Sequence, residues 1–361
     1  MRKRSNKACF FTFLSLFLGL LTLLGGLTAV VDPYFHYHKP LKALQYTLSH
    51  PRYTNDGIMK HFDYDAIITG TSMTQNFKTS ELDNLFDTTA IKVPLPGATY
   101  NEINENLARG LNAHPNTRLV VRGIDYAWLL SPANWSQFDA DTYPYYLYDD
   151  KLYNDVKYLF NKSVLFDETI HTLDYTRSGG RTTTFDDFAI WVASGGFGKE
   201  AVLTYPGYSR PQKVSTTAIF SYADRNAVYA TVTQNITDLA AAYPDTEFYL
   251  FFTPYSIIHW DDLHQTGELE RQLIAEKYAI ELMLPYKNIH LFSFFGDTDA
   301  ICDLDNYKDK HHYGEWVNSQ ILQWMHEGHG ELTAENYEEY CRQEREFYTS
   351  YDYDAIFTEQ D

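Results

Sequence analysis

The chain has 361 residues, which is long for one ordinary domain but within reach of a single α/β domain with insertions. Its 48 acidic and 29 basic side chains give a formal net charge of −19, which argues against a nucleic-acid partner because phosphate binding needs a basic face. With only three cysteines in the chain there is no zinc or iron–sulfur pattern, and we expect neither a metal nor a cofactor.

The N-terminal segment has the pattern of a membrane anchor. Residues 1–7 are rich in basic side chains, and an uncharged stretch follows at 8–31. Its 24 residues are enough to cross a hydrocarbon core of ~30 Å as a helix. Basic residues precede this stretch and none follows it directly, which predicts a cytoplasmic tail and an extracytoplasmic remainder. A cleaved secretory signal is the alternative, although its apolar region is usually shorter. We therefore expect a single-pass protein of the cell membrane.

After the anchor, a juxtamembrane segment at 32–62 holds three prolines and predicts irregular or short-helical structure. Five short apolar runs then alternate with amphipathic windows, which predicts a mainly parallel sheet covered on both faces. The expected strands are Ala66–Thr69, Ala90–Pro94, Arg118–Arg122, Glu247–Thr253 and Ile289–Phe294. The expected helices are Tyr100–Ala113, Asp224–Tyr243, Gly267–Leu284 and Glu315–His326.

The α/β domain is expected at 63–330, and its regular alternation is interrupted at 131–215. That interval is rich in glycine and lacks clear periodicity, so we predict an inserted subdomain or long loops. Loops of this length in compact domains often form lids or binding surfaces. The tail at 331–361 is acidic and rich in tyrosine.

The first expected strand ends in the turn Gly70-Thr71-Ser72, and Ser72 is the leading nucleophile candidate. Open parallel sheets bind ligands beyond the carboxyl ends of their strands, and Ser72 lies just past such an end. A serine alone carries little information, because serines at strand ends are mostly caps and a hydroxyl needs an activating base.

A base and an orienting carboxylate occur near the other end of the domain, in Asp309-Lys310-His311-His312. We expect His312 to accept the proton of Ser72, and Asp309, three residues earlier, to fix the tautomer of the imidazole. His311 is the competing base. The predicted catalytic residues are therefore Ser72, His312 and Asp309.

An acyl-transfer site also needs hydrogen-bond donors for a developing oxyanion. The second strand ends shortly before Gly97, whose backbone N–H is the expected donor together with that of Ser72. The third run ends at Gly123-Ile124-Asp125, and Asp125 marks a third candidate position. Both glycines are equally consistent with tight turns alone.

These motifs resemble those of SGNH/GDSL hydrolases. Gly70-Thr71-Ser72 looks like the first block of that family, Pro96-Gly97 falls at its second, and Asp309-x-x-His312 looks like its last. The third block departs, because the family has Gly-x-Asn where this chain has Asp125, and an ionised aspartate cannot donate to an oxyanion. The resemblance extends over residues 63–327 and implies a three-layer α/β/α sandwich of flavodoxin-like type.

The turn Gly70-Thr71-Ser72-Met73-Thr74, with the single N-terminal anchor, is similar to a narrower group of membrane-anchored envelope proteins. That group includes the D-alanyl transfer protein of teichoic-acid D-alanylation and the acetyltransferases of exopolysaccharide assembly. The resemblance implies acyl or acetyl transfer to, or removal from, a cell-surface glycopolymer in a bacterium. It also implies a multi-span membrane acyltransferase as a partner.

Further polar residues follow the fourth strand. His259 and His264, with two acids between them, fit no common metal site, and we interpret them as a polar loop or a substrate contact. We expect Tyr255, His259 and His311 near the pocket. Cys302 and Cys341 lie in the exported part, and the sequence is compatible with a disulfide or with two free thiols.

Three functions are therefore compared. The first is a serine esterase or O-acyltransferase that uses Ser72, His312 and Asp309, with water or a polymer hydroxyl as acceptor. The second is a non-catalytic binding or scaffold protein of an envelope-modification complex, which the missing asparagine and the acidic charge favour. The third is a metal-dependent phosphoesterase built on His259 and His264.

Overall fold

The computed structural model describes residues 6–138, 143–149, 151–191, 193 and 195–358. By its internal contacts the chain divides into two units, which are described separately. The first unit comprises Met1–Phe62 and Phe138–Thr184, and the second comprises Asp63–Gln137 and Phe185–Asp361. The first unit thus takes in 138–184 from the interval predicted as an insertion at 131–215, while the rest of that interval and the acidic tail belong to the second.

The first unit begins with the helix that the uncharged stretch predicts. Its helical elements are α1 (Asn6–Val31), α2 (Pro51–His61), η3 (Tyr145–Leu147), α5 (Val156–Leu159), η4 (Val164–Ile170) and α6 (His171–Arg177). Helix α1 is long and apolar enough to cross a membrane. Its buried residues are Gly25, Thr28 and Val31, which share one face because they are three apart. This face contacts α5 and η4, whereas most of the helix is exposed.

The second unit is built on a six-stranded sheet with the order β2-β1-β3-β4-β5-β6. The strands are β1 (Ala66–Gly70), β2 (Ala90–Pro94), β3 (Leu119–Ile124), β4 (Glu247–Phe252), β5 (Ile289–Phe292) and β6 (Glu331–Leu332). Strands β1 to β5 pair in parallel, and β6 pairs antiparallel with β5. The molecule is therefore an α/β protein with a mostly parallel sheet, as the sequence predicts.

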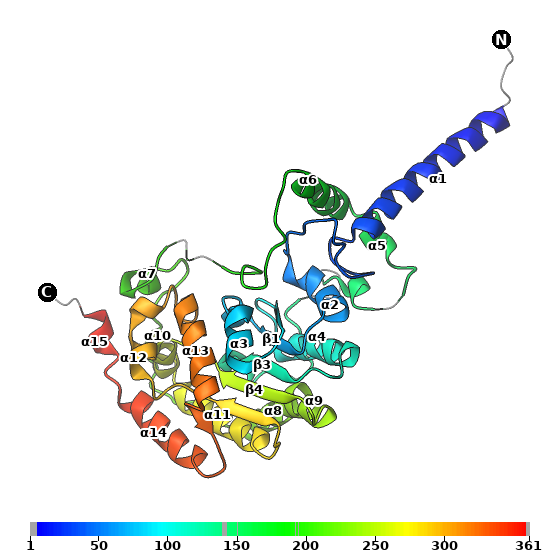
Figure 1. Ribbon diagram of the computed structural model, residues 1–361. Helices are drawn as coiled ribbons and strands as arrows, with labels where there is room; N and C mark the ends of the chain where they lie inside the picture. The colour runs from blue at the N-terminus through cyan, green and yellow to red at the C-terminus, as the bar shows by residue number, and fades with distance from the viewer. Residues whose placement is uncertain (1–5, 139–142, 150, 192, 194, 359–361) are drawn as a thin grey trace. The chain divides into compact units, whose positions relative to one another are not determined.

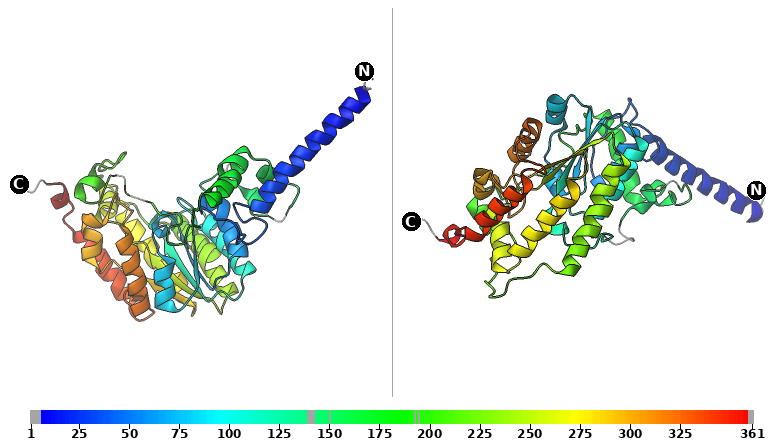
Figure 2. Two further views of the ribbon diagram at one scale, coloured as in Figure 1. Left: turned by 45° about the horizontal axis from the view of Figure 1, so that its top comes forward. Right: turned by 90° about the horizontal axis from the view of Figure 1, so that it is seen from below.

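Helical segments lie between the strands of the second unit and after the last of them. In chain order they are η1 (Ser72–Thr74), α3 (Thr79–Phe86), α4 (Tyr100–Ala113), η2 (Tyr126–Trp128), α7 (Lys199–Leu203), α8 (Tyr222–Val232), η5 (Thr233–Thr237), α9 (Asp238–Ala242), α10 (Ile257–Gln265), α11 (Leu269–Met283), α12 (Thr298–Cys302), η6 (Leu304–Asn306), α13 (Glu315–Glu327), α14 (Tyr337–Ser350) and α15 (Asp354–Phe357). Helix α3 lies beside α13, and α8 lies beside α11 (Figure 2).

Burial explains why the strand sequences are apolar runs instead of alternating patterns. Every residue of β1, β2 and β3 is buried, as expected for parallel strands with both faces covered. Helix α4 starts at the predicted residue because Thr99 and Glu102 form a reciprocal capping box, in which the Glu102 carboxylate accepts the Thr99 N–H at 2.8 Å. Gly328 ends α13 in the left-handed conformation.

The strand order creates a switch point between β1 and β3. From β1 the chain moves to β2 on one side, and from β3 it moves to β4 on the other. At such a point the connections leave in opposite directions and open a crevice at the carboxyl ends of the two strands. Ser72 follows β1 and Asp125 follows β3, so both residues lie at this crevice.

Candidate functional site

Ser72 lies in a tight turn that requires glycine at position 70. Gly70 has a φ of +148°, and a Cβ placed there would lie 2.6 Å from the Cγ2 of Thr74. Thr71 then caps the short helix η1, since its Oγ1 accepts the N–H of Met73 at 3.3 Å. The turn leaves Ser72 half-buried while Thr71 and Met73 on either side are buried.

His312 and Asp309 lie on a narrow loop that immediately precedes α13. The loop is closed by a bridge between Tyr307 and Tyr313 and by a hydrogen bond from the N–H of Lys308 to the carbonyl of His312 at 3.0 Å. Inside the loop, Oδ1 of Asp309 accepts the backbone N–H of His311 at 2.9 Å and that of His312 at 2.8 Å. The carboxylate is therefore held by its own loop.

The structure brings Ser72, His312 and Asp309 together. Ser72 Oγ lies 2.7 Å from His312 Nε2, across 240 residues of sequence. His312 Nδ1 lies 2.8 Å from Asp309 Oδ2. In the tautomer with its proton on Nδ1, the imidazole donates to Asp309 and accepts the hydroxyl proton of Ser72, which is the geometry that general-base activation of a serine requires.

The carboxylate of Asp309 is buried yet remains ionised. Burial raises the pKa of this carboxyl, but hydrogen bonds and charge from His312, with the N–H groups of the loop, outweigh burial and bring the pKa to about 2. The side chain of Asp309 is 9% exposed and that of His312 is 25% exposed. The pair thus combines a shielded anion with an imidazole that a ligand can reach.

Asp125, the candidate third oxyanion position, is hydrogen-bonded to the turn that contains Ser72. Its Oδ2 accepts the hydroxyl of Thr71 at 2.9 Å, and its Oδ1 accepts the hydroxyl of Tyr255 at 2.5 Å. Tyr100 donates to the backbone carbonyl of Asp125 at 2.7 Å. Burial raises the pKa of the Asp125 carboxyl, and the hydroxyls of Tyr255 and Thr71 act in the opposite direction. Asp125 is an acceptor in this network, and both of its oxygens are engaged.

The two expected oxyanion donors follow adjacent strands. Gly70 of β1 pairs with Pro94 of β2, so Ser72 and Gly97 come two and three residues beyond paired positions. Gly97 has a φ of +70° in a turn closed by a hydrogen bond from Ala98 to Leu95 at 3.0 Å. Within the part of the chain that the structure describes, neither the N–H of Ser72 nor that of Gly97 donates to a protein acceptor.

Two residues that the sequence analysis did not single out fix the backbone after Ser72. Asn318 of α13 donates its Nδ2 to the carbonyl of Met73 at 3.0 Å, which ties the serine turn to the helix that follows His312. The buried Lys92 of β2 donates its Nζ to the carbonyl of Gln75 at 2.6 Å and to that of Phe77 at 2.8 Å. Burial lowers the pKa of Lys92 to about 7.

Trp191 contacts both members of the serine–histidine pair. Its Nε1 donates to the backbone carbonyl of Ser72 at 3.3 Å, and its ring lies edge-on to the His312 ring with a centroid separation of 5.6 Å. Lys308 places its Nζ 4.0 Å from the centroid of the indole. Trp191 comes from the non-periodic interval 131–215, where no sequence pattern marks it.

A cavity of about 420 Å³ opens beside His312 and Asp309. The 202–211 segment forms one side, and Arg210 holds that segment by donating to Asp261 of α10 at 2.7 and 2.9 Å. The volume is within the usual range for small-molecule sites. The lining residues are Val202, Tyr205, Pro206, Gly207, Tyr208, Ser209, Pro211, Asp262, Asp309, Lys310, His311 and His312.

His311 lines this cavity but faces away from the serine. Its Nε2 lies 3.1 Å from Nδ1 of His259, which is buried on helix α10 and not in a loop. Burial lowers the pKa of His311 to about 3 and that of His259 well below its usual range, and both rings are therefore neutral near pH 7. Tyr255 packs against both rings, with centroids 4.7 and 4.4 Å away.

His264 is separate from this pair, since its Nε2 lies 3.1 Å from the Nζ of Lys213. Among the residues that the structure describes, no group of three histidine, cysteine or acidic side chains is arranged to hold a metal ion. Cys302 and Cys341 are free thiols, so the second of the two sequence interpretations applies to them.

Comparisons of the chain with protein-family models, with curated proteins and with solved structures found no match.

Proposed function

We propose that this chain is a membrane-anchored serine acyl-ester hydrolase or O-acyltransferase of the SGNH/GDSL type. The observation that carries the proposal is the continuous chain of contacts from Ser72 Oγ to His312 Nε2, at 2.7 Å, and from His312 Nδ1 to Asp309 Oδ2, at 2.8 Å. The cavity beside His312 could hold a substrate. The N–H groups of Ser72 and Gly97, which donate to no protein acceptor among the described residues, could bind its oxyanion.

In the first half-reaction, His312 Nε2 takes the proton of Ser72 Oγ as the oxygen bonds to the acyl carbon. The backbone N–H groups of Ser72 and Gly97 stabilise the resulting oxyanion, and Asp309 stabilises the imidazolium. Collapse breaks the bond to the leaving alcohol or thiol, which takes the proton from His312. Water or a glycopolymer hydroxyl then attacks the acyl-serine with the same histidine as base, which releases the acid or the transferred ester and restores Ser72.

The proposed fold is the three-layer α/β/α sandwich of this family. The strand order 2-1-3-4-5 is that of flavodoxin-like doubly wound sheets. Complete burial of β1, β2 and β3 is consistent with helices on both faces of the sheet.

The proposed location is the outer face of a bacterial cell membrane, with residues 1–7 in the cytoplasm. The length and apolar composition of α1 support the anchor. A cell-surface glycopolymer is the proposed acceptor, and a multi-span membrane acyltransferase is the proposed partner that supplies the acyl group.

A scaffold protein that kept this fold without catalysis is the second candidate. Asp125 favours it, because this residue stands where the family has a hydrogen-bond donor. Both of its carboxylate oxygens already accept hydrogen bonds from hydroxyl groups. If the protein is a scaffold, the Ser72→Ala/His312→Ala double variant will restore envelope acylation fully in cells that lack the wild-type protein.

The decisive experiment is covalent labelling of the full-length protein in detergent by a fluorophosphonate, which bonds to an activated serine oxygen and releases fluoride. We expect Ser72→Ala to abolish both labelling and hydrolysis of p-nitrophenyl acetate. Ser319→Ala is the matched control and should leave both unchanged, because its hydroxyl donates to the Glu315 carbonyl on α13 at 3.3 Å and lies outside both the serine–histidine pair and the cavity lining. Labelling that persists in Ser72→Ala would reject Ser72 as the nucleophile.

A further inference from the structure

The segment from Lys151 to Ile170 in the first unit exposes an unusual amount of apolar surface. Soluble proteins rarely expose a contiguous group of large apolar side chains. Buried side chains of the same segment, such as Tyr158 and Val164, pack into the first unit, whereas six large apolar side chains of this segment are exposed. They are Leu152, Tyr153, Val156, Phe160, Phe166 and Ile170, with exposed fractions from 41% to 78%. We call these six residues the apolar face of the first unit.

This face adjoins helix α1. Elements α5 and η4, which carry Val156, Phe166 and Ile170, both contact α1, and α5 is labelled beside α1 in Figure 1. The ring of Phe160 packs directly on the helix, since a Cβ added at Gly25 would lie 2.9 Å from the Phe160 Cζ. Gly25 is six residues before Val31, the last residue of the uncharged stretch, which corresponds to ~9 Å along the helix axis. If α1 crosses a bilayer, Phe160 lies level with the apolar part of that helix.

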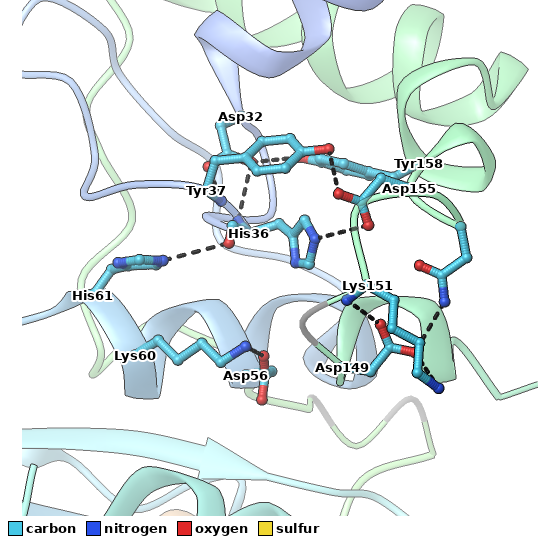
Figure 3. Close-up of polar contacts among 11 residues, drawn as sticks. Asp32, His36, Tyr37, Asp56, Lys60, His61, Asp149, Lys151, Asp155 and Tyr158 are labelled. Atoms are coloured by element: carbon cyan, nitrogen blue, oxygen red, sulfur yellow. Dashed lines mark hydrogen bonds and ion pairs between the residues drawn. The ribbon is translucent and has the colours of Figure 1, made fainter. Parts of the chain in front are cut away.

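A buried polar network holds the segment at this position (Figure 3). Asp32, the first acid after the uncharged stretch, is fully buried, and its carboxylate accepts the backbone N–H groups of residues 36–38 and the hydroxyl of Tyr158 at 2.8 Å. Asp155 lies 3.3 Å from Nε2 of His36 and accepts the hydroxyl of Tyr37 at 3.1 Å. The contacts join the end of α1 to residues 155–158, so the apolar face cannot move away from the helix without breaking them.

The charges around the face suit a lipid surface. Lys157 and Lys162 are exposed on the same segment, and long lysine side chains can place their ammonium groups at lipid headgroups while their neighbours contact acyl chains. Asp167 on this segment and Asp174 on α6 are exposed acids, and Glu168 is paired with His50 at 3.2 Å. Tyrosine and phenylalanine are residues that interfacial elements use on their apolar side.

We propose that this apolar face rests in the interface of the same bilayer that α1 crosses, so that the first unit is a membrane-contacting platform and not only a tether. The inference depends on the proposed anchoring of α1 but not on the chemistry of Ser72. The occupant of the face is the lipid surface, because the face is continuous with the lipid-exposed part of α1 through the contact between Phe160 and Gly25.

Brominated lipids test this in the full-length protein reconstituted into phosphatidylcholine vesicles, because bromine on the acyl chains quenches tryptophan only at short range. Leu152→Trp and Phe166→Trp report the apolar face, and Phe17→Trp reports α1. Emission added by each new tryptophan is compared between brominated and ordinary vesicles. We expect about a twofold loss for Leu152→Trp, Phe166→Trp and Phe17→Trp, since interfacial elements enter ~5–10 Å into the headgroup and acyl boundary.

Two other outcomes have separate meanings. Quenching of Phe17→Trp alone would overturn the proposed contact and leave the anchor intact, as expected if a protein partner or a second copy covers the face. Absence of quenching at Phe17→Trp would reject the anchoring itself, and with it the basis of this inference. Tyr153→Trp provides a second reporter on the face if Leu152→Trp does not accumulate.

Discussion

The two units of this protein each contain an aspartate–histidine pair, and the pairs differ in what surrounds them. In the first unit, Asp155 lies 3.3 Å from His36 Nε2, and both side chains are almost fully buried. In the second unit, Asp309 lies 2.8 Å from His312 Nδ1, and the imidazole is 25% exposed. His312 has in addition a serine hydroxyl on its other nitrogen and a cavity beside it.

Residue type alone does not make a reactive site. The Nδ1 of His36 is buried without a hydrogen-bond partner among the described residues, and its Nε2 faces Asp155. The Nε2 of His312 contacts the hydroxyl of Ser72, and the cavity beside the imidazole could hold a substrate. We interpret the first pair as a structural clamp at the end of α1 and the second as the candidate reaction centre.

Replacement of the two histidines should separate these roles most strongly. His312→Ala should lower kcat for p-nitrophenyl acetate by on the order of 10⁴-fold or more, because the serine loses its base. His36→Ala should leave kcat within about twofold but destabilise the fold by roughly 1–3 kcal/mol, because the buried Asp155 loses a partner. Steady-state kinetics and urea unfolding measure the two effects, and equal kinetic losses in both variants would contradict the distinction.

The aspartates should differ in the same way. Asp309→Asn should lower kcat by on the order of 10³- to 10⁴-fold, because an amide cannot enforce the tautomer with the proton on Nδ1. Asp155→Asn is the matched control and should change kcat little.

A pH dependence accompanies the Asp309 substitution. The native pKa of about 2 is below the unfolded value, so ionised Asp309 stabilises the fold above about pH 4. That contribution, about 2 kcal/mol, is lost as the pH falls through about 2. The stability difference between wild type and Asp309→Asn should therefore be smaller at pH 3 than at pH 6. A difference that grows on acidification would show that Asp309 is not held ionised.

The smallest expected effect concerns Trp191, whose indole donates to the backbone carbonyl of Ser72. Trp191→Phe keeps an aromatic ring near His312 but removes the donor to the Ser72 carbonyl, so kcat should fall about fivefold with KM unchanged, in line with ~1 kcal/mol for one hydrogen bond. Trp324→Phe is the control, since that indole packs on Phe294 away from the site. A rise in KM without a fall in kcat would instead place Trp191 in substrate binding.

Local patterns in the sequence account for much of this architecture. The five apolar runs correspond to β1 to β5, and residues at the ends of neighbouring parallel strands must meet at one edge of the sheet. For this reason the sequence predicts that Ser72, Gly97 and Asp125 lie at the same edge of the sheet. The spacing of Asp309 and His312 predicts their pairing, because it lets one side chain orient the other.

Features that depend on non-local contacts left no such signal. Strand β6 has two residues, which is too short for any period, and Trp191 reaches Ser72 from 119 residues away in a segment without periodicity. The first unit combines residues on both sides of the first three strands, and nothing in the sequence between 138 and 184 indicates that it packs on α1.

The short outer strands of the sheet have a consequence for solubility. β6 occupies one edge with two residues, and β2 at the opposite edge contains the buried Lys92 and ends at Pro94, which has no N–H to donate. An edge strand that is short, or that ends in proline, is a poor template for pairing with a strand of another chain. A protein concentrated on a surface would meet many copies of itself, and these edge strands would protect it from edge-to-edge aggregation.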